Sequence, residues 1–427
     1  MTALHLLHYP SCIILRQKNW RIFGDGSLIL EGVRVIDWTA FLVGPVAGAM
    51  LGDLGADVIK VEQMGRGDPL RGLRTFFGVP LGLPHGRHAA FEHHNRNKRG
   101  IVIDLESPRG QEVIHRLMRK ADVFLTNFRP QACARLGLEY EGLSQHNPKL
   151  IYARASGFGE KGPDSNLPSI DLIPQARSGI MMASGEPHMP PVHISTGLAD
   201  SVTAMMLAYG VISALLDRER SGTGQMVTVS QLGSMMALQG FLVQLKFFPG
   251  LDFPRHDRAR PTNPLYNYYK CQDDRWMALA LILDRHWPPF CRALELPDLE
   301  TDPRFEDTDK RKQNRQELTS LLDRVFATKP YHEWERAFRE ADLIFGPIQE
   351  IADLSTDPQV IENEYVTGFD HPYFGKVKYP GFPVHFSRTP ARLRMAAPEF
   401  GQHTEEVLLE NGYSWDDIAE LGGQGVI

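Results

Sequence analysis

The chain has 427 residues, of which 42% are hydrophobic and 23% charged, so it can bury a large core divided over about two or three domains. Its net charge of −6 is small and no basic stripe runs along the sequence, which argues against a nucleic-acid partner and favours a small molecule. The four cysteines lie far apart without a CxxC pair, indicating neither a zinc site nor a disulfide framework and fitting a reducing compartment.

The first 30 residues combine a short apolar run with the cations Arg16, Lys18 and Arg21. His and Pro interrupt the run and no small-residue cleavage site follows it, so a signal peptide is not indicated, whereas a cationic organelle presequence stays open. No uninterrupted run of about 18 apolar residues predicts a membrane span. We therefore expect a cytoplasmic protein that does not enter a membrane.

The segment from residue 33 to residue 155 alternates between short apolar runs and helical patterns. Strands are expected at 33–38, 56–62, 100–105, 122–128 and 149–155, and helices at 45–55 and 110–121. Strands separated by helices are typical of βαβ units, in which the strands form a parallel sheet. The sequence therefore predicts an α/β fold for this half of the chain.

A long apolar helix is expected from Thr196 to Leu216. Between residues 187 and 216 there is no Lys or Arg, and Asp200 is the single acid. A carboxylate in the first turn binds free backbone N–H groups, which stabilises a helix by about 0.5–2 kcal/mol. However, Ser195 or Thr196 could already supply this cap, and covalent catalysis also places a nucleophilic carboxylate among apolar residues. Both roles stay open for Asp200.

The composition changes after this helix. Residues 218–245 predict a glycine-containing turn, a short strand and a second apolar helix, whereas 248–276 is rich in proline, aromatic and charged residues. Residues 302–326 begin with a segment rich in charged residues and continue into an amphipathic helix. Because the composition changes here, we expect a second domain. Near the end, 401–421 predicts two short helices, the first with Thr404 as its N-cap.

Two further features are ambiguous. Residues 157–162 match GxGxxG after a predicted strand, but Pro163 and Pro168 follow where a dinucleotide-binding motif must open a helix, so this segment is expected to be a loop. Asp171 lies in the polar stretch that follows. It could cap a helix, pair with Arg177 or line a pocket.

Several segments of the chain, in the same order, closely resemble the class III CoA-transferases, the formyl-CoA, carnitine and bile-acid group. These segments are 30–71, 95–110, 127–138, 146–163, 197–225 and 397–414, and the similarity extends from about Leu30 to the C-terminus. The resemblance implies a large α/β domain with a parallel Rossmann-like sheet, a smaller α+β domain and an interlocked homodimer of ring-like subunits. It places the large domain at 1–215 and 350–427, the small domain at 230–340, and linkers at 216–229 and 341–349.

The same resemblance implies a reaction. In that family an aspartate attacks the thioester of a donor acyl-CoA, which gives a mixed anhydride and then an aspartyl-CoA thioester that an acceptor carboxylic acid resolves. The matching residue is Asp200 in the segment GLADSV. CoA and acyl-CoA are then substrates, and neither a metal nor a tightly bound cofactor is expected.

Residues that match the CoA-binding segments of the family are expected to contact CoA. They are Phe41, Asn97, Lys98, Asn127, Phe128, Arg129 and Arg135. Arginine suits phosphate groups because its planar guanidinium presents a fork of donors.

The sequence departs from the formyl-CoA transferases of this family, and two alternative functions were considered. Leu42 replaces the glutamine that formyl-CoA transferases carry after the first strand, and no tetraglycine segment follows, so the formyl and oxalate pair is disfavoured and the carnitine branch looks closer. The α-methylacyl-CoA racemases share a GHDxNY motif, but Ile170 stands here in place of its histidine before Asp171. A CoA-binding protein without catalysis is the third possibility, against which the retention of Asp200 argues.

Overall fold

The computed structural model describes residues 28–427, so the segment considered as a presequence lies outside the described residues. The main sheet has six parallel strands in the order β5-β2-β1-β6-β7-β8. These are β1 (Arg34–Trp38), β2 (Asp57–Gln63), β5 (Lys98–Ile103), β6 (Val123–Thr126), β7 (Ile151–Ser156) and β8 (Met226–Ser230). The five strands predicted between residues 33 and 155 are all present, which confirms the α/β fold with a parallel sheet.

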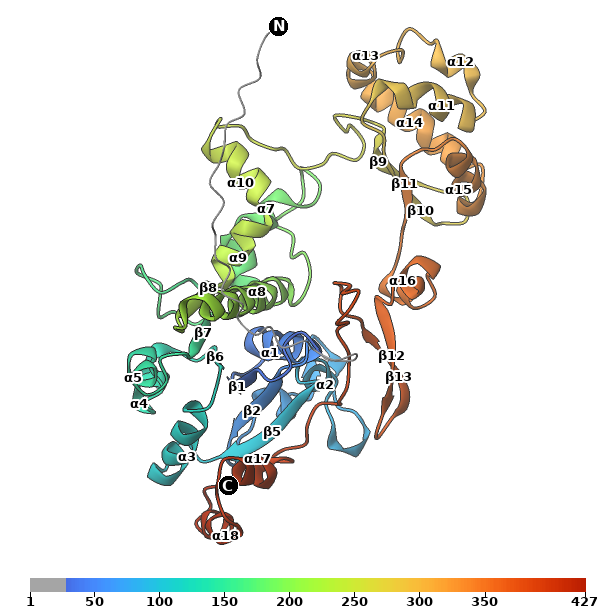
Figure 1. Cartoon of the computed structure of the whole chain (residues 1–427). Coiled ribbons are helices and arrows are strands. Elements are labelled where there is room, and N and C mark those ends of the chain that lie inside the picture. The colour runs from blue at the N-terminus through green and yellow to red at the C-terminus, as the bar shows by residue number, and fades with distance from the viewer. Residues whose placement is uncertain (1–27) are drawn as a thin grey trace, which may run out of the picture.

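Each face of this sheet carries its own hydrophobic core, because successive side chains of a strand point to opposite faces. On one face, Val35 packs with residues of α1 (Val43–Asp53) and α8 (Leu198–Ser221). On the other face, its neighbour Ile36 belongs to a core that includes helices from both halves of the chain. These helices are α3 (Pro108–Met118), α17 (Thr404–Glu410) and α18 (Trp415–Gly423). The C-terminal helices thus return to the sheet that the N-terminal half builds (Figure 1).

The helix α8 is half core and half surface. Leu207 and Val211 are buried against the sheet, whereas Tyr209 and Ile212 are exposed on the opposite side. By length and composition alone, α8 is the one described helix that would suit a membrane span. Since it packs against α1 and β7 along one face, these features are equally those of a core helix.

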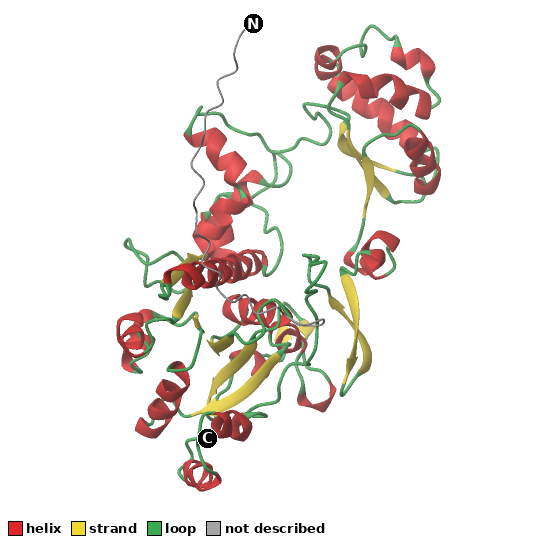
Figure 2. Cartoon of the chain, in the orientation of Figure 1, coloured by secondary structure: helices red, strands yellow, loops and turns green. Residues whose placement is uncertain are grey.

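A second unit, formed by residues 266–348, has a separate hydrophobic core. It contains the antiparallel sheet β11-β10-β9, formed by β9 (Tyr266–Lys270), β10 (Trp276–Ala280) and β11 (Phe345–Ile348). Its helices are α11 (Trp287–Ala293), α12 (Pro297–Glu300), α13 (Thr308–Gln313), α14 (Arg315–Phe326) and α15 (Tyr331–Glu340). Phe290, Phe326 and Trp334 lie fully buried at its centre. Figure 2 shows these helices gathered on the short sheet, away from the main sheet.

Both segments predicted as linkers contain regular structure. Within 216–229, α8 continues to Ser221 and β8 then begins, hydrogen-bonded to β7 as the edge strand of the main sheet. Within 341–349, β11 completes the second sheet by pairing with β10. The predicted single helix after β8 is two helices, α9 (Gln231–Leu238) and α10 (Gly240–Phe247), which meet at Gln239.

The remaining elements connect these units. They are β3 (Thr75–Phe76), β4 (Val79–Pro80), α2 (Ala89–His94), α4 (Pro130–Arg135), α5 (Tyr140–His146), α6 (Leu172–Arg177), α7 (Ile180–Ala183), α16 (Pro358–Glu362), β12 (Val366–His371) and β13 (Gly375–Pro380). In Figure 1 the chain leaves the main sheet through α8 to α10, crosses to the second unit and returns through α16 and the β12–β13 hairpin, so its elements follow an open ring.

Candidate active site

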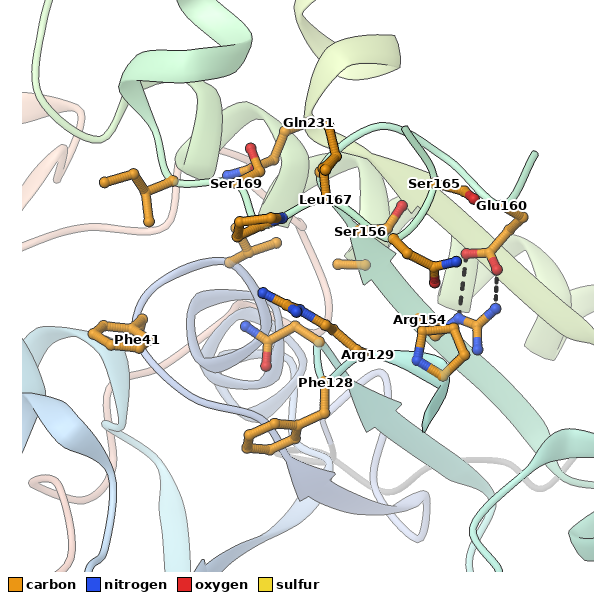
Figure 3. Close-up of a pocket in the computed structure, with 18 of the residues that line it drawn as sticks. Phe41, Phe128, Arg129, Arg154, Ser156, Glu160, Ser165, Leu167, Ser169 and Gln231 are labelled. Atoms are coloured by element: carbon orange, nitrogen blue, oxygen red, sulfur yellow. Dashed lines mark hydrogen bonds and ion pairs between the residues drawn. The ribbon is translucent and has the colours of Figure 1, made fainter. Parts of the chain in front are cut away.

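A cleft of about 580 Å³ opens at the carboxyl ends of β1, β6 and β7. The strand order reverses between β1 and β6, and ligands of open parallel sheets bind outside the carboxyl ends of the strands at such a switch point. The loop after β1 supplies Phe41, the loop after β6 supplies Phe128 and Arg129, and the first turn of α8 supplies Asp200. Figure 3 shows most of these side chains around one hollow.

Asp200 is positioned at the start of α8 without capping it. The N-cap is Gly197, which has a left-handed φ of 79° and no side chain to offer, so neither Ser195 nor Thr196 has the predicted capping role. The carboxylate of Asp200 instead accepts a hydrogen bond from the Nε2 amide of Gln231, the first residue of α9. The helix therefore holds Asp200 in place while its carboxylate stays in the cleft.

The surroundings of Asp200 raise its pKa from 3.8 to about 6. Burial is the main cause, the nearby charge of Asp171 adds to it, and the hydrogen bond from Gln231 opposes it. With a pKa of about 6 the group is still about nine-tenths ionised at pH 7. It is also more basic than an ordinary aspartate, which suits a carboxylate nucleophile.

Asp171 caps the helix that carries Asp200. Its carboxylate accepts from the backbone N–H groups of Gly197 at 2.9 Å, Ala199 at 2.8 Å and Asp200 at 3.3 Å. Of the three roles that the sequence left open, capping is therefore the one observed, although the capped helix is distant in sequence. Arg177 does not pair with Asp171; it forms an ion pair with Asp164 at 2.6 Å.

The loop after β1 is held in a strained shape at the mouth of the cleft. Phe41 has a positive φ of 63°, which is unfavourable for a side chain of this size, and the residue is 54% exposed. Asn127 fixes the loop by accepting from the backbone N–H of Ala40 at 2.9 Å and donating to its carbonyl at 2.8 Å. Asp68 accepts from the N–H of Phe41 at 3.3 Å. Both predicted residues, Phe41 and Asn127, thus line the cleft.

The lining of the cleft includes an aromatic ring and an arginine that has no ion-pair partner among residues 28–427. Phe128 packs on Trp38 with ring centroids 4.3 Å apart. Arg129 lines the cleft, and among residues 28–427 its guanidinium has no hydrogen-bond or ion-pair partner. The first turn of α1, at Leu42 and Val43, also lines the cleft and carries neither a side-chain cap nor an acidic residue. A helix N-terminus and a free arginine both favour an anionic ligand.

Three predicted CoA contacts do not lie in the cleft. Arg135 is exposed at the end of α4 and lies 3.7 Å from Glu106. Asn97 and Lys98 precede and begin β5, so they lie at the amino end of a strand, whereas the cleft is at the carboxyl ends. The direction of the strand therefore places Asn97 and Lys98 away from the cleft, and their contact with CoA stays a prediction.

The side chains of Asn97 and Lys98 are engaged inside the protein. Lys98 is fully buried, and its Nζ donates to Asp37 at 2.7 Å, to the carbonyl of Pro45 at 2.7 Å and to Asn95 at 2.9 Å. The Nδ2 of Asn97 donates to Asp53 at 2.7 Å and to the carbonyl of Arg392 at 2.8 Å. These contacts give both side chains a structural role.

Several cleft residues were not predicted. Arg154 and Ser156 come from the carboxyl end of β7, and Arg154 pairs with Glu160 in the loop that follows. The predicted strand at 149–155, together with the rule that ligands bind at carboxyl ends, could have indicated Arg154. Gln231 could not have been found in this way, because its position depends on the pairing of β8 with β7.

The comparisons identify the class of enzyme. The model of CoA-transferase family III matches residues 30–404, and the chain therefore belongs to this family and is a CoA-transferase. It is 34% identical to an acyl-CoA transferase of Fusarium pseudograminearum, over 93% of this chain and 88% of that protein. It is also 34% identical to the cinnamoyl-CoA:phenyllactate CoA-transferase of Clostridium sporogenes, over 93% of this chain and 97% of that protein.

A solved structure supports the fold assignment. A CAIB/BAIF family protein from Brucella suis superposes with a TM-score of 0.80 at 30% identity, covering 90% of this chain and 99% of that chain. Among the described residues, no histidine lines the cleft, and Ile170 occupies the position that a racemase gives to one. Proton exchange next to a thioester requires a positioned acid and base. The racemase alternative is therefore disfavoured.

Proposed function

We propose that this protein transfers CoA from an acyl-CoA donor to a small carboxylic acid, with Asp200 as the nucleophile. A carboxylate oxygen of Asp200 attacks the thioester carbonyl and the C–S bond breaks. CoA departs as a thiolate, and the donor acyl group stays bound to Asp200 as a mixed anhydride. The thiolate then attacks the carbonyl of Asp200, which releases the donor acid and forms an aspartyl-CoA thioester. The acceptor carboxylate repeats these steps in reverse, so acceptor acyl-CoA leaves and the carboxylate of Asp200 is regenerated.

The observation that carries this proposal is the position of the Asp200 carboxylate. It lies in the cleft, bound to Gln231 and free of any capping role. Its raised pKa gives it the basicity of a nucleophile while it stays ionised at neutral pH. The partly closed cleft shields an anhydride from water, which would otherwise hydrolyse it.

CoA binding is proposed for the cationic part of the same cleft. Among residues 28–427, Arg129 offers an unpaired guanidinium, the first turn of α1 offers the positive end of a helix, and Phe41 and Phe128 offer apolar surface. This set suits phosphate groups at one end and a thioester at the other. The names of the relatives give different acyl-CoA and acid pairs, such as cinnamoyl-CoA with phenyllactate and succinyl-CoA with glutarate, so we leave the acyl donor and the acceptor acid open.

A homodimer of interlocked rings is part of the proposal. A compact monomer of 48.1 kDa exposes about 16,500 Å², whereas this chain exposes 25121 Å². Even if residues 1–27 contribute the most that a fully extended chain can, about 4,600 Å², an excess of about 4,000 Å² remains. Counted over two chains, this excess is larger than the roughly 2,000–5,000 Å² that obligate dimers commonly bury, so it is enough for a dimer interface.

The exposed surface also has the composition of an interface. Large apolar side chains are exposed along α8, α10 and the segment that follows α10. They include Met205, Tyr209, Ile212, Leu216, Phe241, Phe247, Phe248 and Phe253. Apolar patches of this extent mark protein interfaces. The division into a large and a small domain and the cytoplasmic location stay predictions.

The proposed mechanism is tested at Asp200. Asp200→Asn should keep the fold and lose CoA transfer, because an amide can form neither the anhydride nor the aspartyl-CoA thioester. Asp217→Asn, which changes an exposed aspartate on the same helix, is the control and should transfer CoA at the wild-type rate. Wild-type protein given acyl-CoA without an acceptor should carry CoA at Asp200, located by peptide mapping. Transfer at the wild-type rate by the Asn variant, checked to be free of deamidated protein, would refute Asp200 as the nucleophile. CoA binding by a wild-type protein that transfers no CoA would instead favour the non-catalytic alternative.

A further inference from the structure

Asp171 makes more contacts than a residue that merely begins a short helix. It occupies the N-cap position of α6, yet its carboxylate makes no capping hydrogen bond there. Its oxygens accept instead from the three backbone N–H groups of Gly197, Ala199 and Asp200 at the start of α8. A fourth donor is the Nε2 of Gln175, at 2.8 Å.

The orientation of this carboxylate is fixed by a buried amide. Gln175 is completely buried, and its Nε2 donates both to Asp171 and to the carbonyl of Ser195, at 2.8 Å each. Ser195 precedes α8 by a few residues, so the same amide ties Asp171 to the chain that leads into the helix. Hydrogen bonds to a charged acceptor are stronger than neutral ones. The first turn of α8 is therefore held from outside the helix.

From this arrangement we infer that Asp171 is a positioning residue for CoA transfer, which fixes the start of α8 and places a negative charge beside the carboxylate of Asp200. The inference rests on the proposed function of Asp200. Because Gly197 cannot cap the helix, loss of Asp171 leaves three N–H groups without their acceptor and the backbone of Asp200 less constrained. The like charge makes the carboxylate of Asp200 more basic and so more nucleophilic.

Other charged groups around Asp200 bear on any pH effect. His193 lies beside Asp171, with its Nε2 3.9 Å from the carboxylate, and Gln231 faces Asp200 from α9 without titrating. Arg129 and the Arg154–Glu160 pair line the same cleft. Of these, Asp171 is the charge that raises the pKa of Asp200, after burial. A change at Asp171 should therefore shift the acid limb of the pH profile of the rate of adduct formation.

The experiment measures formation of the CoA adduct in a single turnover, with acyl-CoA and no acceptor, from pH 5 to 8. Asp171→Asn should still form the adduct at Asp200, about ten- to a hundredfold more slowly at neutral pH. Its acid limb should move to lower pH by about half a unit or more, since Asp200 loses a like charge and ionises more readily. Asp307→Asn is the matched control, because Asp307 caps α13 in the second unit, and it should change neither quantity.

The possible outcomes distinguish a positioning role of Asp171 from a purely structural one. A folded Asp171→Asn protein with the wild-type rate and acid limb overturns it, and so does a slower rate with an unmoved acid limb, which would mean a purely structural cap. If the Asn variant does not fold, Asp171→Ser supplies a neutral cap, and failure of both to fold assigns Asp171 to stability alone and overturns the inference. Absence of any adduct at Asp200 in the wild type refutes the proposed function itself, a result distinct from all of these.

Discussion

Asp200→Asn should stabilise the folded protein at neutral pH. The carboxylate of Asp200 is removed from water and lies close to the like charge of Asp171, and both effects raise its pKa from 3.8 to about 6. The folded protein therefore keeps this carboxylate ionised at pH 7 only at a cost in free energy. An asparagine has no charge to bury and can still accept the hydrogen bond from Gln231.

The pH dependence follows from the two pKa values. Since the folded pKa is the higher one, the folded protein binds the proton more tightly than the unfolded chain between pH 3.8 and 6. The contribution of Asp200 to the free energy of unfolding therefore falls as pH rises through this window. The loss reaches about 3 kcal/mol at pH 7 and is about half a kcal/mol at pH 4. Asp200→Asn does not have this loss.

The measurement is the difference in free energy of unfolding between the two proteins, from urea titrations at pH 4 to 8 and one fixed protein concentration. The Asn variant should be more stable by about 3 kcal/mol at pH 7, and the difference should shrink toward zero at pH 4. Asp217→Asn, on the exposed side of the same helix, should show no such trend. A difference at Asp200 that is independent of pH, or of opposite sign at pH 7, would refute the reasoning.

Three more predictions concern the cations and the surface. Lys98→Met should lower the free energy of unfolding by about 3–5 kcal/mol, because Asp37 stays buried without its partner, and adding Asp37→Leu should recover much of this loss in denaturant titrations. Arg129→Ala should weaken CoA binding about ten- to a hundredfold by calorimetry, whereas Arg135→Ala, outside the cleft, should leave it unchanged. Sedimentation should show a dimer that Tyr209→Glu disrupts, and a stable wild-type monomer at micromolar concentration would contradict the interface.

Much of the main sheet was predictable because its strands are buried on both faces. Such strands appear in the sequence as continuous apolar runs between helical patterns, as at 56–62 and 122–128, and all of these were found. The edge strand β8 was expected as a short strand but assigned to a linker. It is only partly buried and follows a glycine-containing turn, and its place in the sheet depends on pairing with β7 some 70 residues earlier. Local sequence does not encode that pairing.

The site was predictable in part, for similar reasons. Asp200 stood out because it is the single acid in a long stretch without other charges. The role of Asp171 could not be chosen, because its partners at Gly197 and Ala199 come together only through the fold. Lys98 was expected to contact CoA because it matches a family segment, whereas in the structure it begins a buried strand and reaches inward to Asp37.

The two carboxylates at the start of α8, those of Asp171 and Asp200, differ in the hydrogen bonds that they accept. Among the described residues, Asp171 accepts from three backbone N–H groups and from Gln175, whereas Asp200 accepts from Gln231 alone. A carboxylate held by many donors is stabilised as an anion and fixed in place, and one with few donors keeps lone pairs free for reaction. The same short segment of backbone thus anchors one acid and presents the other. Pairs of acids whose surroundings differ in this way commonly take different roles in catalysis. Exchanging their surroundings, by adding donors to Asp200 or removing them from Asp171, should therefore slow CoA transfer without any change to the cations that hold the substrate.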